Sequence, residues 1–345
     1  MSLPIPSGPG EITAGWLSRA LGHTVSDVSL TRIGEDEGFT GGGLYRLEMA
    51  GGGSLIAKLS PADPQMRATF ASANAREVGF YTRIAPGLPV PDCLYGACDA
   101  ETGASILLLQ DLGRLRAGLF VEGLGVDDAR ALMAALAEIH AAWWGAPVVS
   151  GLSGAAIVRE FSFAGAWAAY PQALARLLPD IELPEAFLAL GAHIAAHPDE
   201  VFGALLEQGP LTVLHRDCHV DNVMFDARGC ALILDWQIMG KGRGTYDVAY
   251  SLISSLPAPL RRRAERDLVA FYHSELIRGG VTGYGAAQCW EEYRRAVISK
   301  LFASVVATVL LDNSGLAKQA WRRADLVRLL AFCADHALTP ADFWA

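Results

Sequence analysis

The segment at residues 215–222, His-Arg-Asp-Cys-His-Val-Asp-Asn, carries side chains whose types and spacing could support phosphoryl transfer. It contains His215, Asp217 and Asn222, and the apolar run that follows ends at Asp235 in Leu-Asp-Trp. Magnesium prefers hard oxygen ligands and usually takes one or two from the protein, with phosphates and water supplying the rest. Asn222 and Asp235 suit that role. Asp217 suits the carboxylate that orients an attacking hydroxyl or accepts its proton.

Three short strands are predicted around this segment. Residues 211–214 are apolar and partly β-branched, which favours a strand. Residues 223–225 and 231–234 favour two more, and the turn at 226–229 contains a glycine that can take positive φ. Asp217 and Asn222 then lie on the loop after the first strand. Asp235 ends a hairpin that can fold back beside them. We therefore expect the three oxygen-bearing side chains to meet in one place.

The His-x-Asp-x-x-x-x-Asn pattern followed by Leu-Asp-Trp resembles the catalytic segment of the protein-kinase-like small-molecule kinases, which include aminoglycoside phosphotransferases and choline and ethanolamine kinases. The continuation with LDWQ and GKGRGTYDVAY most resembles the ecdysteroid-kinase-like, CHK-type branch. By this resemblance, Asp217 is the catalytic base, and Asn222 and Asp235 bind magnesium. His215, which we count with the catalytic residues, and Asp247 support the loop.

The resemblance implies an α+β, bilobal protein-kinase-like fold, with an antiparallel-sheet N-terminal lobe and a mainly helical C-terminal lobe. An apolar strand at residues 54–59 contains Lys58, which resembles the kinase lysine that pairs with the α- and β-phosphates. A helix is predicted at 67–84, with Glu77 in its middle. An ion pair between the two would hold the ammonium group. The alternatives are a solvent-exposed lysine on an edge strand and Arg76 as the residue that reaches the phosphate.

The glycine-rich stretch at residues 34–43 lies between strands predicted at 25–33 and 44–49. Such a loop could cover nucleotide phosphates, because glycine lets the backbone N–H groups approach an anion closely. Its spacing departs from G-x-G-x-x-G, and three carboxylates precede its tip. A flexible hairpin loop is the alternative, and the amides that would contact phosphate stay open.

A hinge between the lobes is predicted after the strands at 93–96 and 105–109. Gln110 and Leu112 resemble hinge residues whose backbone groups hydrogen-bond adenine; a plain strand leaving the sheet is the alternative. We therefore expect a nucleotide-binding lobe over residues 1–110 and a catalytic and substrate-binding lobe over 111–345.

The second lobe is expected to be mostly helical, and acceptor selectivity is expected to reside in its helices. His140 is interpreted as a core histidine, and Arg261, Arg262 and Arg263 as a solvated helix start. Apolar periodicity and flanking prolines and glycines predict helices at residues 126–144, 155–178, 184–206, 246–255, 259–278, 285–311 and 316–336.

Composition narrows the class of protein. The chain has 345 residues, 52% of them hydrophobic and 19% charged, which suits a globular enzyme of two lobes and excludes a largely disordered chain. A formal net charge of −9 argues against nucleic-acid binding and is compatible with cationic substrates. The six cysteines form no C-x-x-C pair, which supports neither zinc nor a disulfide framework.

No targeting segment is predicted. The start, MSLPIPSGPG, has neither a basic region nor an apolar core typical of a secretion signal. The apolar stretch at residues 301–311 is too short to span a bilayer. We expect a cytoplasmic protein without a membrane span, and the oligomeric state stays open.

The expected reaction is transfer of the γ-phosphoryl group of ATP, with Mg²⁺, to a hydroxyl of a small molecule such as an aminoglycoside, an amino alcohol, a steroid or a related metabolite. The main alternative is a catalytically inactive kinase-fold binding module. A Ser-His-Asp hydrolase would need a G-x-S-x-G elbow, and a protein kinase would need a long activation segment with its Ala-Pro-Glu anchor; neither is present. The acceptor, and ATP against GTP, stay open.

Overall fold

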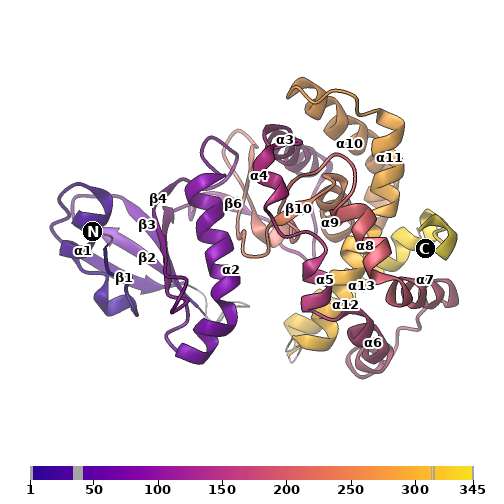
Figure 1. The fold of residues 1–345 in the computed structure, drawn as a ribbon, viewed down its shortest axis with the longest axis horizontal. Helices are drawn as coiled ribbons and strands as arrows, with labels where there is room; N and C mark the ends of the chain where they lie inside the picture. Colours follow the sequence, from indigo (N-terminus) through magenta and orange to yellow (C-terminus); the bar gives the residue numbers. More distant parts are fainter. Residues whose placement is uncertain (1–2, 34–41, 312, 314, 344–345) are drawn as a thin grey trace. The chain divides into compact units, whose positions relative to one another are not determined.

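The computed structural model describes residues 3–33, 42–311, 313 and 315–343. The chain forms two compact units (Figure 1). The first comprises Met1–Leu115 with Leu234–Met239, and the second comprises Arg116–Ile233 with Gly240–Ala345. The predicted α+β fold is confirmed, because the first unit contains an antiparallel sheet and the second is mainly helical. A division into lobes at residue 110 stays a prediction. Leu234–Met239, which we expected in the second lobe, packs with the first unit.

The first unit is built on a five-stranded antiparallel sheet of order β1-β2-β3-β5-β4. Figure 1 shows helices α1 and α2 on opposite faces of this sheet. The elements are η1 (Pro9–Glu11), α1 (Ala14–Leu21), β1 (Val28–Arg32), β2 (Gly43–Met49), β3 (Ser54–Leu59), α2 (Pro64–Arg83), β4 (Cys93–Cys98) and β5 (Ser105–Gln110).

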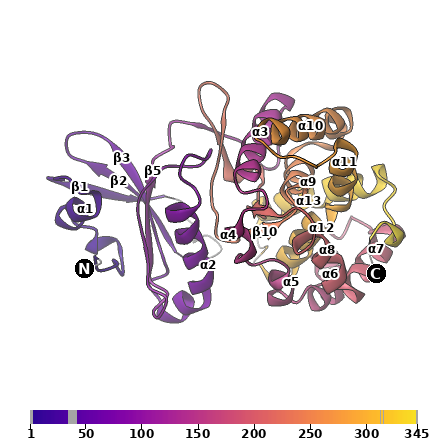
Figure 2. The same cartoon turned by 45° about the horizontal axis from the view of Figure 1, so that its top comes forward.

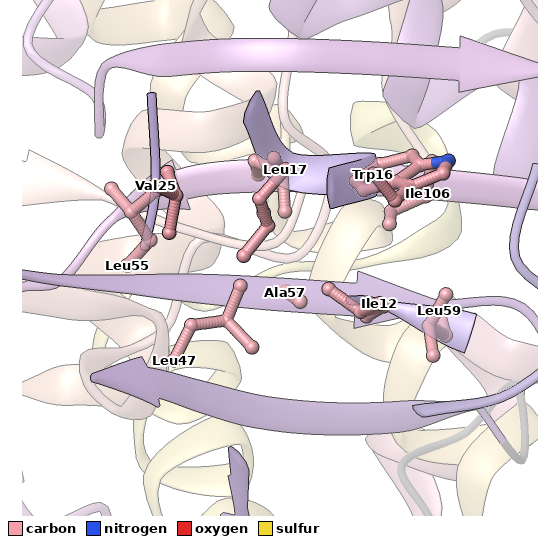
Figure 3. Packing of buried hydrophobic residues seen from close by; sticks show 10 residues of the cluster. Ile12, Trp16, Leu17, Val25, Leu47, Leu55, Ala57, Leu59 and Ile106 are labelled. Atoms are coloured by element: carbon pink, nitrogen blue, oxygen red, sulfur yellow. The ribbon is translucent and has the colours of Figure 1, made fainter. Parts of the chain in front are cut away.

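Strand alternation decides which side chains of β3 face which helix. Leu55, Ala57 and Leu59 are buried with Trp16 and Leu17 of α1 in one hydrophobic cluster (Figure 3). Because successive side chains of a strand point to opposite faces, the residues between them point toward α2. An apolar row on one face of β3 therefore directs the lysine of that strand to the other face.

Both helices of the first unit begin at side-chain caps. Thr13 accepts a hydrogen bond from the Trp16 amide at 3.2 Å at the start of α1. Helix α2 begins three residues before the predicted start, because Asp63 caps it by accepting from the Met66 amide at 2.8 Å, with Pro64 at the first helical position. Proline is favoured there, since its missing N–H would have no partner inside the helix.

The second unit consists of helices with two small sheets. Strand β7 pairs with β10, and the second sheet has the order β6-β8-β9. The elements are β6 (Arg116–Ala117), α3 (Val126–Ala142), α4 (Pro147–Ser150), α5 (Ala156–Glu160), α6 (Phe163–Leu177), α7 (Glu185–Ala196), α8 (Pro198–Leu206), β7 (Thr212–Leu214), η2 (Val220–Asn222), β8 (Val223–Phe225), β9 (Ala231–Ile233), β10 (Gly240–Gly242), α9 (Thr245–Ser255), α10 (Ala258–Arg278), α11 (Ala286–Arg295), α12 (Val297–Leu310), α13 (Leu316–Asp335) and η3 (Pro340–Asp342).

Three helices predicted as continuous are each broken into two. Between α5 and α6, Ser162 has a φ of 44°, which no right-handed helix contains. Between α7 and α8, Pro198 cannot donate a backbone hydrogen bond and starts a new helix after His197. The third break lies at Ala296, where the sequence offers neither proline nor glycine. Over the described residues, no helix combines the length and the apolar character that crossing a bilayer requires.

Helix α9 is the central helix of the second unit. All of its residues are buried, and it packs against α3, α10, α11, α12 and α13 (Figure 2). A polar side chain on a helix that is covered on every side is costly unless a partner satisfies it, and Asp247, Tyr250 and Ser251 each have one. The polar residues of α9 are therefore informative about what they contact.

The interpretation of the arginine cluster at the start of α10 is wrong for its first member. Arg261 is fully buried and pairs with Glu265 at 2.5 Å and with Asp335. Arg262 and Arg263 are exposed, as expected. Periodicity could not show this difference, because Arg261 is buried through partners that lie on its own helix and on α13.

We predict that Leu108→Ala, in the core of the first unit, lowers the free energy of unfolding by about 2–5 kcal/mol. Leu108 is fully buried in β5, so its truncation leaves a cavity under α1. Urea unfolding measures the change. The matched control is Leu94→Ala in β4, whose side chain is exposed; its free energy of unfolding should stay within about 0.5 kcal/mol of the parent. Equal losses for the two variants would contradict the assigned core.

Candidate functional site

The first unit holds a lysine between two carboxylates. The Nζ atom of Lys58 lies 2.8 Å from Glu77 Oε1 and 2.9 Å from Asp235 Oδ1. Lys58 reaches them because it occupies the face of β3 that points toward α2, where Glu77 is buried. The predicted Lys58–Glu77 ion pair is therefore formed, whereas its role in binding a cofactor stays a prediction.

Asp235 is held in place by the residues that follow it. Its φ of 62° lies in the left-handed region, which costs a non-glycine residue about 1 kcal/mol. Trp236 stacks on Phe80 of α2 with ring centroids 3.8 Å apart, and the Nε atom of Arg76 donates to the Gln237 carbonyl at 3.2 Å. Helix α2 thus fixes the segment that presents the Asp235 carboxylate to the lysine.

Charge and burial oppose each other in this cluster. Burial disfavours the Lys58 ammonium, but the carboxylates of Glu77 and Asp235 outweigh it and raise the pKa of Lys58 above its usual value. Burial raises the pKa of Glu77, with Lys58 acting against burial and Asp235 acting with it. The lysine is therefore a permanent positive charge in a partly enclosed position, which is the property that binding a phosphate requires.

The predicted hinge residues lie at the end of β5. The Gln110 amide donates to the Asp92 carbonyl at 2.8 Å, and the Leu112 carbonyl accepts from the Leu115 amide at 2.8 Å. Between them, Asp111 pairs with Arg46 at 2.8 Å. These groups are engaged within the first unit, so the role of Gln110 and Leu112 in adenine recognition stays a prediction. Of the glycine-rich loop, Gly34–Gly41 lies outside the described residues.

In the second unit, Asp247 of α9 organises the 215–222 loop. Its Oδ2 accepts from the His215 amide at 2.6 Å, and its Oδ1 accepts from the Arg216 amide at 2.8 Å. The buried His140 supports the carboxylate, with Nε2 at 3.3 Å from Oδ2 and Nδ1 at 2.8 Å from the Tyr272 hydroxyl. His140 is thus a buried core residue, as the sequence interpretation had it, and Asp247 supports the loop by accepting its N–H groups.

Two further residues of α9 contact the same loop. The Tyr250 hydroxyl donates to Asp217 Oδ1 at 2.5 Å, and the Ser251 hydroxyl donates to the Cys218 carbonyl at 2.7 Å. Positions 247, 250 and 251 follow the i, i+3, i+4 spacing that places residues on one helix face. One face of a buried helix therefore bonds four consecutive loop residues.

Arg216 gives the loop its sharp bend. Its φ is 74°, a strained conformation for a residue with a side chain. Its guanidinium donates to the carbonyls of Gly154 at 2.9 Å and Lys241 at 3.0 Å, and also to that of Ser153. These contacts hold the arginine, so the residue after it emerges in a fixed direction.

Asp217 is surrounded by groups that orient it. Its amide donates to His215 Nδ1 at 3.1 Å, and its carbonyl accepts from Asn222 Nδ2 at 3.0 Å. His219 Nε2 lies 3.6 Å from Oδ1, on the side of the Tyr250 hydroxyl. Because Asn222 uses its nitrogen toward the loop, its Oδ1 is the atom suited to a cation. The loop thus brings Asp217 and Asn222 together; a meeting of these two with Asp235 stays a prediction.

The Asp217 carboxyl group is ionised. Burial opposes the charge, but His219 and the hydrogen bond from Tyr250 outweigh it, with His215 adding to them, and hold the pKa of Asp217 well below its usual range. Sequence reasoning missed His219 and Tyr250. The helical spacing of Tyr250 from Asp247 was a signal in the sequence that could have found Tyr250. No comparable signal in the sequence pointed to His219.

A sequence match over the region that contains both clusters shows the family of the chain. The model of the phosphotransferase enzyme family matches residues 44–292, which contain both clusters. The chain belongs to the phosphotransferase enzyme family. This membership confirms the resemblance to small-molecule kinases. A search of curated proteins returns no match.

Solved structures share the fold of this family member at low identity. A candidate aminoglycoside phosphotransferase of Ralstonia eutropha JMP134 is 14% identical with a TM-score of 0.55, over 96% of this chain and 98% of that one. A candidate fructosamine-3-kinase of Thermobifida fusca YX-ER1 is 17% identical with a TM-score of 0.52, over 95% and 100%. Amicoumacin kinase hAmiN, crystallised with AMP-PNP, Ca²⁺ and Ami, is 11% identical with a TM-score of 0.52, over 94% of each chain.

The side-chain oxygens of Asn222 and Asp235 are of the chemical type that magnesium prefers, and a role for either residue in binding it stays a prediction. In the described part of the chain, no three His, Cys, Asp or Glu side chains gather closely enough to hold a metal ion. Magnesium needs no such group, because one or two oxygen ligands suffice when phosphates supply the others. The Asn222 carbonyl and the Asp235 carboxylate, whose side chain is 44% exposed, are ligands of this kind.

We predict that Asp247→Asn lowers the free energy of unfolding by about 1–3 kcal/mol, because an amide cannot accept from both loop N–H groups. Hydrogen exchange at the His215 and Arg216 amides should accelerate, and denaturant unfolding gives the free energy. Asp199→Asn, at an exposed ion pair with Arg159, is the control and should change it by less than about 0.5 kcal/mol. Unchanged exchange at both amides would exclude the role of Asp247.

Proposed function

We propose that this phosphotransferase family member is an ATP-dependent small-molecule kinase that moves the γ-phosphoryl group to a hydroxyl. The observation that carries the proposal is the Asp217 carboxylate, oriented by Tyr250 and fixed in a loop that Asp247 holds. The Lys58 cluster of the first unit, a cation between two carboxylates, gives further support.

Nucleotide binding is proposed for the first unit. Lys58 would pair with the phosphates, and Glu77 would hold its ammonium in position, as their 2.8 Å ion pair supports. The backbone near Gln110 and Leu112 would contact adenine. The AMP-PNP bound by amicoumacin kinase hAmiN supports a nucleotide for this fold. ATP is the proposed donor because it is the abundant cellular triphosphate.

Magnesium is proposed to be held by Asn222 and Asp235. When bound, it would neutralise charge on the nucleotide phosphates. The 2.9 Å contact between Asp235 and Lys58 places a fixed cation next to this carboxylate, so the two cationic groups would share the phosphate charge. The chain supplies oxygen ligands and leaves the remaining ligands to the nucleotide.

Asp217 is proposed to orient the acceptor hydroxyl. The acceptor oxygen forms a bond to the γ-phosphorus as the bond from that phosphorus to the β–γ bridging oxygen breaks. ADP leaves with the electron pair of that bond, and the hydroxyl proton passes to the Asp217 carboxylate. A loose transition state asks little covalent chemistry of the protein, so positioning and charge neutralisation give most of the rate.

The proposed acceptor is an aminoglycoside, an amino alcohol, a steroid or a related metabolite. The net charge of −9 supports a small-molecule acceptor over a nucleic acid. All six cysteines are free thiols, which supports a reducing compartment, and we propose the cytoplasm. ADP release from Mg-ATP across a panel of such hydroxyl compounds identifies the acceptor class.

We predict that Asp217→Ala abolishes transfer, with a loss of at least about 10²-fold, while Mg-ATP still binds. Asp235→Ala should instead weaken the binding of Mg-ATP itself. Thermal unfolding measures binding, since ligand at a hundredfold over Kd stabilises the parent by about 2.7 kcal/mol. Asp180→Ala, at an exposed pair with Arg323, is the control for both readouts.

Near-normal turnover of Asp217→Ala would exclude Asp217 as the base. Stabilisation by Mg-ATP without turnover on any acceptor would mean that the panel lacks the acceptor. A parent protein that neither turns over nor gains stability with Mg-ATP would exclude the kinase and favour a catalytically inactive binding module.

A further inference from the structure

We propose that Tyr250 is a positioning residue that determines which oxygen of Asp217 meets the acceptor, and that the buried Lys300–Asp325 ion pair holds the Tyr250 ring for this task. The inference rests on the proposed function and adds three residues to it. All four side chains belong to the second unit, so their contacts are internal to one compact body.

The Tyr250 hydroxyl distinguishes the two oxygens of the Asp217 carboxylate. It donates to Oδ1 at 2.5 Å, and His219 Nε2 lies 3.6 Å from the same oxygen. With Oδ1 engaged on this side, Oδ2 is the oxygen that takes the acceptor proton. Burial, together with the charge of Asp217, holds the pKa of Tyr250 well above its usual value, so the hydroxyl remains a donor.

The Tyr250 ring is fixed by more than its own helix. The Lys300 Nζ atom, from α12, lies 4.6 Å from the ring centroid, a distance at which an ammonium interacts favourably with an aromatic face. Lys300 in turn lies 2.5 Å from Asp325 of α13, and each of these two side chains is only 1% exposed. Tyr250 of α9 is therefore linked through Lys300 of α12 to Asp325 of α13.

A buried ion pair needs a reason other than stability. Removing two charges from water is costly, and well-packed apolar residues of similar volume are often equally or more stable. Lys300 and Asp325 bridge α12 and α13 directly against the residue that bonds Asp217. These contacts indicate that the ion pair serves to orient the Tyr250 ring.

The second unit offers a matched control. Arg261 and Glu265 form another buried ion pair, at 2.5 Å. Its further partners are Asp335, the ring of Phe332, the Tyr293 hydroxyl and His336. None of these partners belongs to the 215–222 loop. Replacing this pair removes two buried charges, as replacing Lys300 and Asp325 does, but it leaves Tyr250 and its contacts unchanged.

The first experiment compares steady-state kinetics in the full chain. Tyr250→Phe removes only the hydroxyl, and we expect kcat to fall 10- to 100-fold with an unchanged KM for ATP. The double variant Lys300→Met with Asp325→Leu should lower kcat as well. Combining all three substitutions should lower it no further than Tyr250→Phe does alone. Arg261→Met with Glu265→Leu should leave kcat within twofold of the parent.

Unchanged kcat in Tyr250→Phe would overturn the proposal. Independent, multiplicative losses for Tyr250→Phe and the Lys300–Asp325 double variant would overturn the part that assigns the ion pair to the tyrosine. A fall in kcat for the Arg261–Glu265 control equal to that for the Lys300–Asp325 variant would do the same, because it would show a general loss of structure.

A second measurement needs no activity. A double-mutant cycle of Tyr250→Phe with Asp217→Asn in urea unfolding should show coupling of at least tenfold in the unfolding equilibrium constant. Additive effects would overturn the inference even if the protein proves to be a kinase. Strong coupling in a protein that transfers no phosphoryl group would support the contact and exclude the proposed function.

Discussion

The structure of the 215–222 loop depends on one carboxylate buried in one helix. Asp247 accepts hydrogen bonds from the amides of His215 and Arg216, and it lies beside His140. Because these contacts fix the backbone on both sides of a strained residue, the next residue along the chain leaves the bend in one direction. The whole of α9 must be buried for this to hold, which is why five other helices pack around it. The helical second unit can therefore be understood as the support of four consecutive loop residues.

The first unit holds a cation between two carboxylates. Alternation along β3 puts three apolar residues against α1 and Lys58 on the opposite face, and α2 places a buried carboxylate at hydrogen-bond distance. Asp235 joins this cluster although its neighbours in sequence belong to the β8–β9 hairpin, because Trp236 stacks on Phe80. Left-handed backbone conformations occur at Arg216 and at Asp235, one in each cluster. Such strain persists only where surrounding contacts over-determine it, and each of the two residues has contacts of this kind.

Sequence reasoning succeeded where chemistry was local. The residue types and spacing at 215–222 and the hairpin after them follow from short-range patterns, and the structure forms that hairpin. The Lys58–Glu77 pair, which was expected from the resemblance to kinases, is formed as well. Helix ends were less predictable, because neither Ser162 nor Ala296, where two of the breaks lie, is a proline or a glycine. The burial of Arg261 was missed because its partner Asp335 lies 74 residues away along the chain. Tyr250 was within reach, because it shares a helix face with Asp247, but Lys300 and Asp325 carry no pattern that connects them to it.

The separation between what holds the loop and what surrounds the acceptor bears on how one fold serves many acceptors. Within the described residues, the hydrogen bonds to Asp217 come from α9 and from the loop itself, and none comes from α6, α7 or α8. Ser153, Gly154 and Lys241 add to this support through the Arg216 guanidinium. Under the proposed function, substitutions on those helices would leave the hydrogen bonds to Asp217 in place. Members of one family can share a fold and differ in acceptor, so membership leaves the acceptor to experiment. Helices α12 and α13 are the exception, since through Lys300 and Asp325 they reach the tyrosine that bonds the base. A change of acceptor that remodels these two helices must therefore preserve that pair or replace its hold on Tyr250.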